Sequence, residues 1–252
     1  MDFAPEEYGG YDPTEMGADQ TMVLPVILVV DASGSMNQPP TKIGQVNDGA
    51  RRVLDYLKND FNDPKTKPMF ACLKFSSKSE WVNPNNPYDE PSKFKWQDIN
   101  TAGSTNFAHA CEVLNTVLTT KDNGGWITGR KNCLKPVIIV MSDGGSTHEY
   151  DNDLAILKKR GWFDKAFKFG IAIGATANKA MLTAFTGKEK YVLDTDNFND
   201  TSLAEIIKII VQESSVVSSL DTDRGKDEHD EVAEMIEDIA LNGPPGLGEE
   251  TP

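Results

Sequence analysis

Short apolar segments that alternate with amphipathic segments are the feature that most restricts the fold of this chain. Residues 26–30 (VILVV) and 136–142 (PVIIVMS) are nearly continuous apolar runs rich in β-branched side chains. Such runs are typical of strands that are buried on both faces of a sheet. Between them, the apolar side chains of residues 41–61 recur every three or four positions, which is the spacing of one helix face.

The remaining segments continue this alternation of strands and helices. Further strands are expected at residues 69–75, 80–82, 168–173 and 191–193. Further helices are expected at residues 107–118, 154–162, 178–185 and 203–212. Strands that alternate with helices pair in parallel through right-handed crossovers. We therefore predict a Rossmann-like α/β fold, in which helices flank both faces of a central, mainly parallel sheet.

The length of 252 residues is enough for one sizeable α/β domain with tails. We place this domain at residues 22–213, after an acidic N-terminal extension at residues 1–21. Residues 214–252 are rich in Ser, Asp, Glu, Gly and Pro, so we expect an acidic, flexible C-terminal tail.

One part of this tail has the pattern of a docking helix. Residues 231–241 (EVAEMIEDIAL) place apolar side chains at helical spacing within an acidic segment. Such a stripe fits docking on this domain, on another copy or in a groove of a partner, and disordered acidic sequence is the alternative. The stripe consists of Val232, Met235, Ile236 and Ile239.

The net charge of -14 disfavours two classes of partner. An acidic surface repels phosphate backbones and anionic lipids, so we expect neither nucleic acid nor membrane as a partner. The apolar runs are far shorter than the roughly 20 residues that cross a bilayer. Three cysteines without a CxxC pair favour a reducing compartment, and no signal peptide is visible, so a cytoplasmic location is expected.

Three loops rich in oxygen donors lie at the ends of these predicted elements. DASGS at 31–35 follows the first strand, AGSTN at 102–106 precedes the helix that begins at 107, and SDG at 142–144 ends a later strand. In open α/β sheets, ligands bind beyond the carboxyl ends of the strands. We therefore expect these loops to form one site.

Carboxylate and hydroxyl oxygens in these loops suit a single divalent cation. Mg²⁺ prefers about six oxygen ligands and retains water, so it is the expected cofactor, with Mn²⁺ or Ca²⁺ as alternatives. Because few of the donors are carboxylates, the ion would keep positive charge and accept an anionic ligand. The candidate metal ligands are Asp31, Ser33, Ser35, Thr105 and Asp143.

The segments VVDASGSM, AGSTNFAHA and VIIVMSDGG resemble, in order and strand context, the metal-ion-dependent adhesion site of von Willebrand factor A domains. The resemblance spans about residues 23–212. It implies that Ser33, Ser35 and Thr105 hold the metal directly, and that Asp31 and Asp143 act partly through water. It also implies that a Glu or Asp carboxylate of a protein partner takes the open position on the metal.

Three local features also resemble the bacterial TerY-like proteins of tellurium-resistance and stress gene clusters. They are the PVILVVDASGSM segment, NDG at 47–49 and the segment 126–135 that precedes the SDG strand. Relatives of that group lie beside kinase- and phosphatase-like genes. The resemblance therefore implies an adaptor or scaffold in a bacterial stress or signalling system, with partners of the kinase or phosphatase type.

Two other functions remain as alternatives to a non-catalytic binding module. One is a Mg²⁺-dependent phosphoester hydrolase, and the other is a structural subunit whose metal only stabilises the loops. A haloacid-dehalogenase-type phosphatase would need Asp-x-Asp where this chain has Asp31-Ala32-Ser33. The sequence also lacks a nucleophile elbow and a phosphate-binding GxGxxG or GKS/T loop. We therefore predict no catalytic residues, and we assign His109 to the surface or to a supporting position rather than to the metal.

Overall fold

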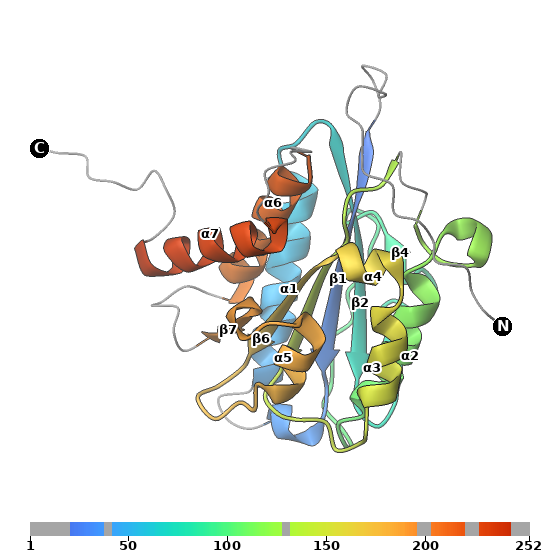
Figure 1. The fold of residues 1–252 in the computed structure, drawn as a ribbon, viewed down its shortest axis with the longest axis vertical. Coiled ribbons are helices and arrows are strands. Elements are labelled where there is room, and N and C mark those ends of the chain that lie inside the picture. Colours follow the sequence, from blue (N-terminus) through green and yellow to red (C-terminus); the bar gives the residue numbers. More distant parts are fainter. Residues whose placement is uncertain (1–20, 38–41, 128–131, 196–202, 220–226, 243–252) are drawn as a thin grey trace, which may run out of the picture.

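The computed structural model describes residues 21–37, 42–127, 132–195, 203–219 and 227–242. Within these residues, a seven-stranded sheet has the strand order β3-β2-β1-β5-β6-β7, and β4 pairs with β2. Helices cover both faces of this sheet (Figure 1). The proposed N-terminal extension lies almost entirely outside the described residues.

The sheet is parallel except at one edge. β1 pairs in parallel with β2 and β5, and β5-β6-β7 continue the parallel arrangement, whereas β3 and β4 run antiparallel to β2. The predicted mainly parallel sheet is therefore confirmed. The strands are β1 Met22–Asp31, β2 Thr66–Phe75, β3 Ser79–Trp81, β4 Tyr88–Asp89, β5 Val137–Ser142, β6 Phe167–Ala172 and β7 Val192–Asp194.

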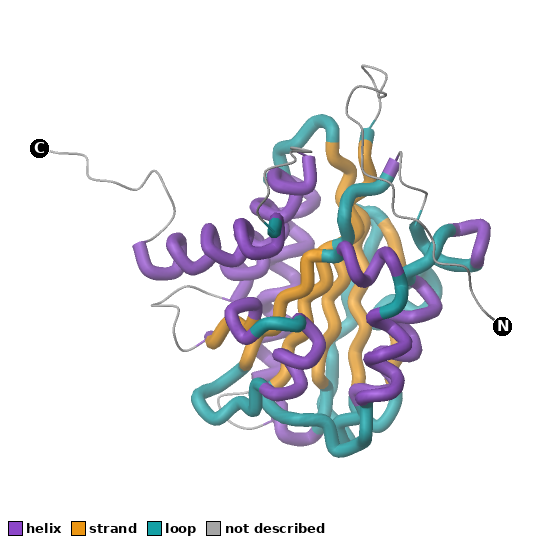
Figure 2. Tube along the Cα trace, in the orientation of Figure 1, coloured by secondary structure: helices purple, strands orange, loops and turns teal. Residues whose placement is uncertain are grey.

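The helices form one layer on each side of the sheet (Figure 2). The first layer contains α1, α6 and α7, and the second contains α2, α3, α4 and α5. No helix of the described segments is long and apolar enough to cross a membrane. The bounds are α1 Lys42–Asn59, α2 Phe107–Val117, α3 Asp151–Lys158, α4 Gly161–Lys165, α5 Ala180–Thr186, α6 Leu203–Ser219 and α7 Glu228–Asn242.

Each helix layer encloses its own hydrophobic core, and β1 contributes to both. Val26 and Leu28 belong to the core under α1 and α6, whereas Ile27 and Val29 belong to the core under α2 and α3. All four side chains are at most 1% exposed. Side chains of a strand alternate between the two faces, so a strand covered on both sides has no solvent-facing positions. This burial explains why the segment is apolar at every position.

The short strand β4 was not among the expected elements, and two further differences concern helices. The single helix expected at residues 154–162 is two helices, because Arg160 adopts an extended conformation between α3 and α4. The resulting change of direction lets both Trp162 and Phe163 pack in the core. α6 extends to Ser219, so the domain boundary placed at residue 213 falls inside this helix.

Candidate metal centre

The pairing of β1 with β5 brings the first and third loops together. Val30 lies opposite Met141 in the parallel register, so Asp31 and Ser142 continue side by side at the carboxyl ends of the two strands. The carboxyl ends of these central parallel strands form a platform, beyond which ligands of open α/β sheets bind. The sequence therefore places the two acidic loops next to each other through strand register alone.

Asp31 is fully buried at the base of this platform. Its Oδ1 accepts a hydrogen bond of 2.8 Å from the Ser33 backbone N–H, and its Oδ2 accepts one of 2.6 Å from the Ser142 hydroxyl. Burial raises the pKa of Asp31 above its usual value, although these hydrogen bonds oppose the shift. A carboxylate that is desolvated in this way is stabilised by a positive charge close to it.

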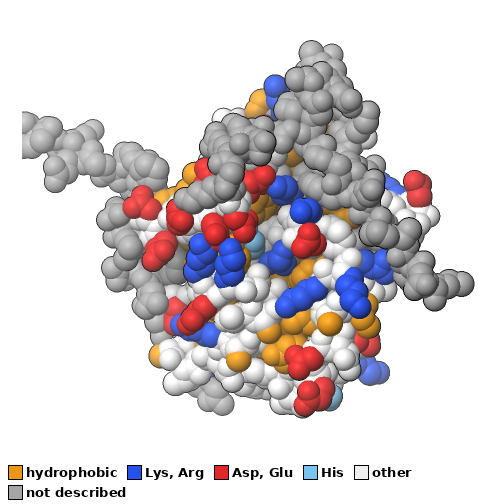
Figure 3. Space-filling view, viewed as in Figure 1, with side chains coloured by type: hydrophobic (Ala, Val, Ile, Leu, Met, Phe, Trp, Pro, Cys, Tyr) orange, Lys and Arg blue, Asp and Glu red, His pale blue; other side chains and the backbone are white. Residues whose placement is uncertain are grey.

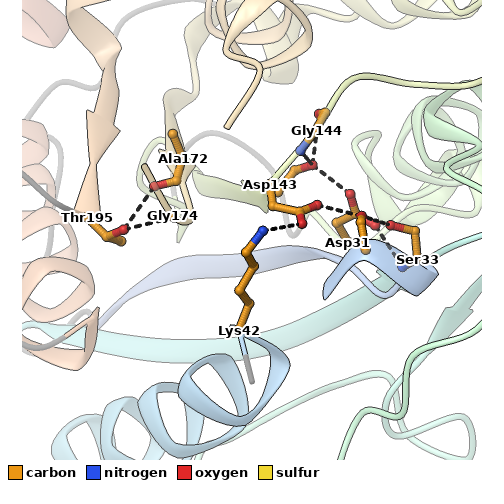
Figure 4. A network of polar contacts seen from close by, with 10 residues as sticks. Asp31, Ser33, Lys42, Asp143, Gly144, Ala172, Gly174 and Thr195 are labelled. Atoms are coloured by element: carbon orange, nitrogen blue, oxygen red, sulfur yellow. Dashed lines mark hydrogen bonds and ion pairs between the residues drawn. The ribbon is translucent and has the colours of Figure 1, made fainter. Parts of the chain in front are cut away.

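A chain of oxygen atoms leads from the first loop to the third (Figure 4). The hydroxyls of Ser33 and Ser35 are 3.1 Å apart, and the Ser35 hydroxyl donates to Oδ1 of Asp143 over 2.8 Å. The other carboxylate oxygen of Asp143 accepts a hydrogen bond of 2.6 Å from the Lys42 ammonium. Lys42 therefore supplies the positive charge that the structure places at this carboxylate.

The second loop is held against the first by two backbone hydrogen bonds. The N–H of Gly34 donates to the carbonyl of Gly103 over 3.1 Å, and the N–H of Ala102 donates to the carbonyl of Ala32 over 2.8 Å. Gly103 has a φ of 79°, and a Cβ atom there would lie 2.4 Å from Oγ of Ser77. This close approach restricts the position to glycine.

The backbone of Thr105 ties the second loop to the third. Its carbonyl accepts hydrogen bonds from the N–H of Thr147 (2.8 Å) and the hydroxyl of Ser146 (3.0 Å). Its N–H donates to the Thr147 hydroxyl over 3.1 Å. Thr105 as a whole is 6% exposed, so this loop is buried where it meets the third loop.

His109 has a structural role beside this loop. Its backbone N–H donates to the side chain of Asn106, the N-cap of α2, and its Nδ1 accepts a hydrogen bond of 3.1 Å from the N–H of Ser79. These contacts fix the start of α2 against β3. They agree with the assignment of His109 to a supporting position.

The structure thus joins Asp31, Ser33, Ser35 and Asp143 in one hydrogen-bonded network, and it attaches Thr105 through backbone contacts. These oxygens have the chemistry of a hard-cation site, in which hydroxyls and few carboxylates leave room for water. The described residues contain no cluster of three or more His, Cys, Asp or Glu side chains that could hold a metal, so a metal site here would depend on the hydroxyls.

Sequence reasoning gave no role of their own to three residues that complete the network, namely Lys42, Ser142 and Thr147. Ser142 is the first residue of the SDGG segment and Thr147 follows that segment by two positions, and their small hydroxyl side chains near Asp143 are a signal that local reading could have used. Lys42 carries no such signal. It reaches Asp143 from the start of α1, and only the packing of that helix on the sheet creates the contact.

Comparisons with known proteins agree with this architecture. Residues 26–146 match the family model of the von Willebrand factor type A domain. Two solved structures of proximal thread matrix protein 1 from the mussel byssus are 17% identical, with TM-scores of 0.54 and 0.53, and cover 78% of this chain and 49% of theirs. The second is described as having a zinc-occupied MIDAS motif. With 49% of their length covered, this chain spans about half the length of these proteins. A comparison with curated proteins gave no significant match.

Proposed function

We propose that this chain, which carries a von Willebrand factor type A domain, is a non-catalytic module that binds an acidic group of a protein partner through a divalent cation. One observation carries the proposal. Two carboxylates and two serine hydroxyls meet in a single network beyond the carboxyl ends of β1 and β5. Ligands of open α/β sheets bind at this edge.

Each side chain would have a distinct task around the ion. Ser33, Ser35 and Thr105 would coordinate it directly, and Asp31 and Asp143 would act partly through water. The bound cation supplies uncompensated positive charge, which attracts a Glu or Asp carboxylate of the partner. The chain itself fixes the geometry of these oxygens by hydrogen bonds of its three loops.

Mg²⁺ is the expected ion, because oxygen ligands and retained water suit it best. Mn²⁺ and Ca²⁺ are alternatives with the same ligand preference. Zn²⁺ is also a candidate, since a structurally similar protein is described with zinc at its metal site.

The biological setting extends the proposal further. The TerY-like features favour an adaptor in a bacterial stress or tellurium-resistance system, with partners of the kinase or phosphatase type. The core positions of Cys72 and Cys111, both free thiols, suit a reducing compartment such as the cytoplasm. The net charge of -14 favours protein partners over nucleic acid or membranes.

Metal binding is expected to raise the melting temperature of the wild type. A ligand that binds only the folded state adds about 2.7 kcal/mol at one hundred times its dissociation constant. That corresponds to roughly 5–10 °C for a domain of this size. Thr105→Val, which removes a hydroxyl and keeps the volume, is expected to lose most of this shift. The measurement is thermal melting with EDTA, Mg²⁺, Mn²⁺, Ca²⁺ and Zn²⁺ in turn.

Thr116→Val is the matched control, because it removes an exposed hydroxyl on the outer side of α2. It should respond to metal as the wild type does. If no ion shifts the wild-type melting temperature, the metal-dependent function is wrong. If both threonine variants keep the full shift, Thr105 is not a ligand.

The bound ion is expected to exchange water for a carboxylate. Bound Mn²⁺ enhances the relaxation of water protons in proportion to the exchangeable waters that it holds. Acetate should lower this enhancement in the wild type, whereas acetamide, which has the same shape without the charge, should not. An enhancement that acetate leaves unchanged would favour the structural subunit, and turnover of p-nitrophenyl phosphate that depends on Thr105 would favour the hydrolase.

A further inference from the structure

The helix α7 packs against α6 on the outer side of the sheet (Figure 1). Val232, Ala233 and Ile236 are at most 5% exposed and belong to the core that α1 and α6 share. The first turn of α7 lies beside the beginning of β6, whereas the candidate metal centre lies at the carboxyl ends of the strands. α7 is therefore docked away from the candidate metal centre.

His229, in this first turn, is partly buried against aromatic side chains of the domain. Its ring is stacked on Tyr191, with centroids 3.7 Å apart and planes at 4°. The rings of Phe169 and Phe167 meet it edge-on at 4.9 and 5.8 Å. Contact with three aromatic rings removes water from the imidazole, and this desolvation disfavours its charged form.

The hydrogen bond of His229 requires the same neutral form. Its Nε2 accepts a hydrogen bond of 3.2 Å from the backbone N–H of Lys168. A ring nitrogen that accepts carries no proton, so the single proton of this imidazole is on Nδ1. If Nε2 also carried a proton, its N–H would face the backbone N–H of Lys168. The hydrogen bond that holds α7 against β6 would then be lost.

The buried charge of Lys168 also opposes protonation of His229, and its effect is larger than the opposite effect of either Asp227 or Asp230. The ammonium of Lys168 is held by the backbone carbonyls of Phe163, Asp164 and Ala166, at 2.8 to 3.0 Å. Burial lowers the pKa of Lys168 to about 8, so this group stays charged at neutral and acid pH. Burial, and then the charge of Lys168, lower the pKa of His229 from 6.5 to about 3.

Other charged groups surround the same region, and several of them form ion pairs. Asp230 pairs with Lys188 and Lys190 at 2.8 Å each and accepts a hydrogen bond from Tyr191. These contacts hold the pKa of Asp230 well below its usual range, so its carboxylate remains ionised. The groups that line the cavity of about 540 Å³ beside His229 include Lys135, Asp164, Lys165, Lys168, Lys188, Tyr191, Asp227 and Glu228.

Two further ion pairs join α7 to the domain, Lys135 with Glu228 and Lys188 with Asp227 at 3.3 Å. Figure 3 shows lysines and carboxylates side by side in the left half of this face. Lys135, Lys188 and Lys190 each face a carboxylate here, whereas the ammonium of Lys168 is held by backbone carbonyls. His229 is instead a group whose pKa falls, from 6.5 when it is free to about 3 when α7 is docked.

We propose that α7 is a detachable helix whose docking requires a neutral His229, so that mild acid releases it from β6 and α6. The direction follows from linkage. Because the pKa of His229 is lower in the docked state, the neutral histidine stabilises docking fully above its free pKa of 6.5. This stabilisation is lost as the pH falls towards 3. The docking constant should fall by up to about tenfold per pH unit in this interval. Release would expose the rings of Phe167, Phe169 and Tyr191.

Methyl NMR of the full chain tests the proposal without a bulky probe attached to α7. As the pH falls from neutral to about 4, the methyl signals of Val232 and Ile236 should move to undocked positions, while those of Val26 and Ile139 in the sheet stay unchanged. The nitrogen shifts of His229 should report the Nδ1–H neutral form until the helix is released. A His229 that takes up a second proton while the α7 methyl signals remain docked would overturn the proposal.

His229→Gln separates the histidine from other acid effects. Its amide oxygen can still accept the N–H of Lys168, but it does not titrate, so α7 should stay docked across the same range. The exposed His148→Gln is the matched control and should release α7 as the wild type does. Release of α7 in His229→Gln at the wild-type pH contradicts the proposal. Should that variant fail to dock even at neutral pH, the wild-type nitrogen shifts alone decide the question.

Discussion

Phe107→Ala is expected to lower the free energy of unfolding by about 3–5 kcal/mol, the usual cost of a large aromatic cavity in a core. Phe107 is fully buried at the first position of α2. Its ring contacts Phe75, Tyr150 and Phe185 at centroid distances of 5.5 to 5.7 Å. These partners lie on β2, beside α3 and on α5, so few side chains can shift together to fill the space.

The same substitution is expected to weaken metal binding, because Phe107 anchors the end of the loop that carries Thr105. Urea denaturation in EDTA measures the stability effect, and a metal titration of the folded variant measures the effect on the site. Ile156→Ala is the control. Ile156 is 51% exposed on α3, so its loss should change stability by no more than about 0.5 kcal/mol. A cost below about 1 kcal/mol for Phe107→Ala would show that this core relaxes around the cavity.

The fold was predictable because its central strands are buried on both faces. β1 and β5 lie between two helix layers, and a strand in that position has to be apolar at almost every residue. The alternation with amphipathic helices then leaves a parallel sheet as the simplest solution. Edge elements carry a weaker signal. β4 consists of only Tyr88–Asp89, and its position depends on the pairing with β2.

Contacts between segments far apart in the sequence were not predictable in the same way. The break at Arg160 depends on which core Trp162 and Phe163 enter, and helical periodicity does not reveal that choice. The pairing of Lys42 with Asp143 spans 101 positions. The environment of His229 likewise exists only after α7 has docked on β6. Periodicity describes one element at a time, whereas these features belong to pairs of elements.

The candidate metal ligands were predictable because they lie in loops at the ends of recognisable strands. Strand register then accounts for the contact between the loops of Asp31 and Asp143. The sequence did not reveal how Asp31 is held, with Ser33 on one carboxylate oxygen and Ser142 on the other. Metal coordination itself stays a prediction, and Asp31 offers its sharpest test.

Asp31→Asn is expected to stabilise the metal-free protein and to destroy its response to metal. The amide oxygen can accept the N–H of Ser33 as before, and the amide nitrogen can donate to the Ser142 hydroxyl, which can still donate to the carbonyl of Gly144. The hydrogen bonds therefore survive while a buried negative charge next to Asp143 disappears. We expect a gain of about 1 kcal/mol in EDTA, or roughly 2–4 °C in melting temperature.

In saturating metal the order of stability is expected to reverse. Removing a carboxylate that orients metal ligands or their waters typically costs 10–100-fold in affinity, and here it also removes one of the two charges that attract the ion. Thermal melting of both proteins in EDTA and in the stabilising metal measures the two effects together. Asp55→Asn, the same change at an exposed position of α1, should alter neither. A variant that is less stable in EDTA yet keeps its metal response would mean that the Asp31 carboxylate holds the loop rather than the ion.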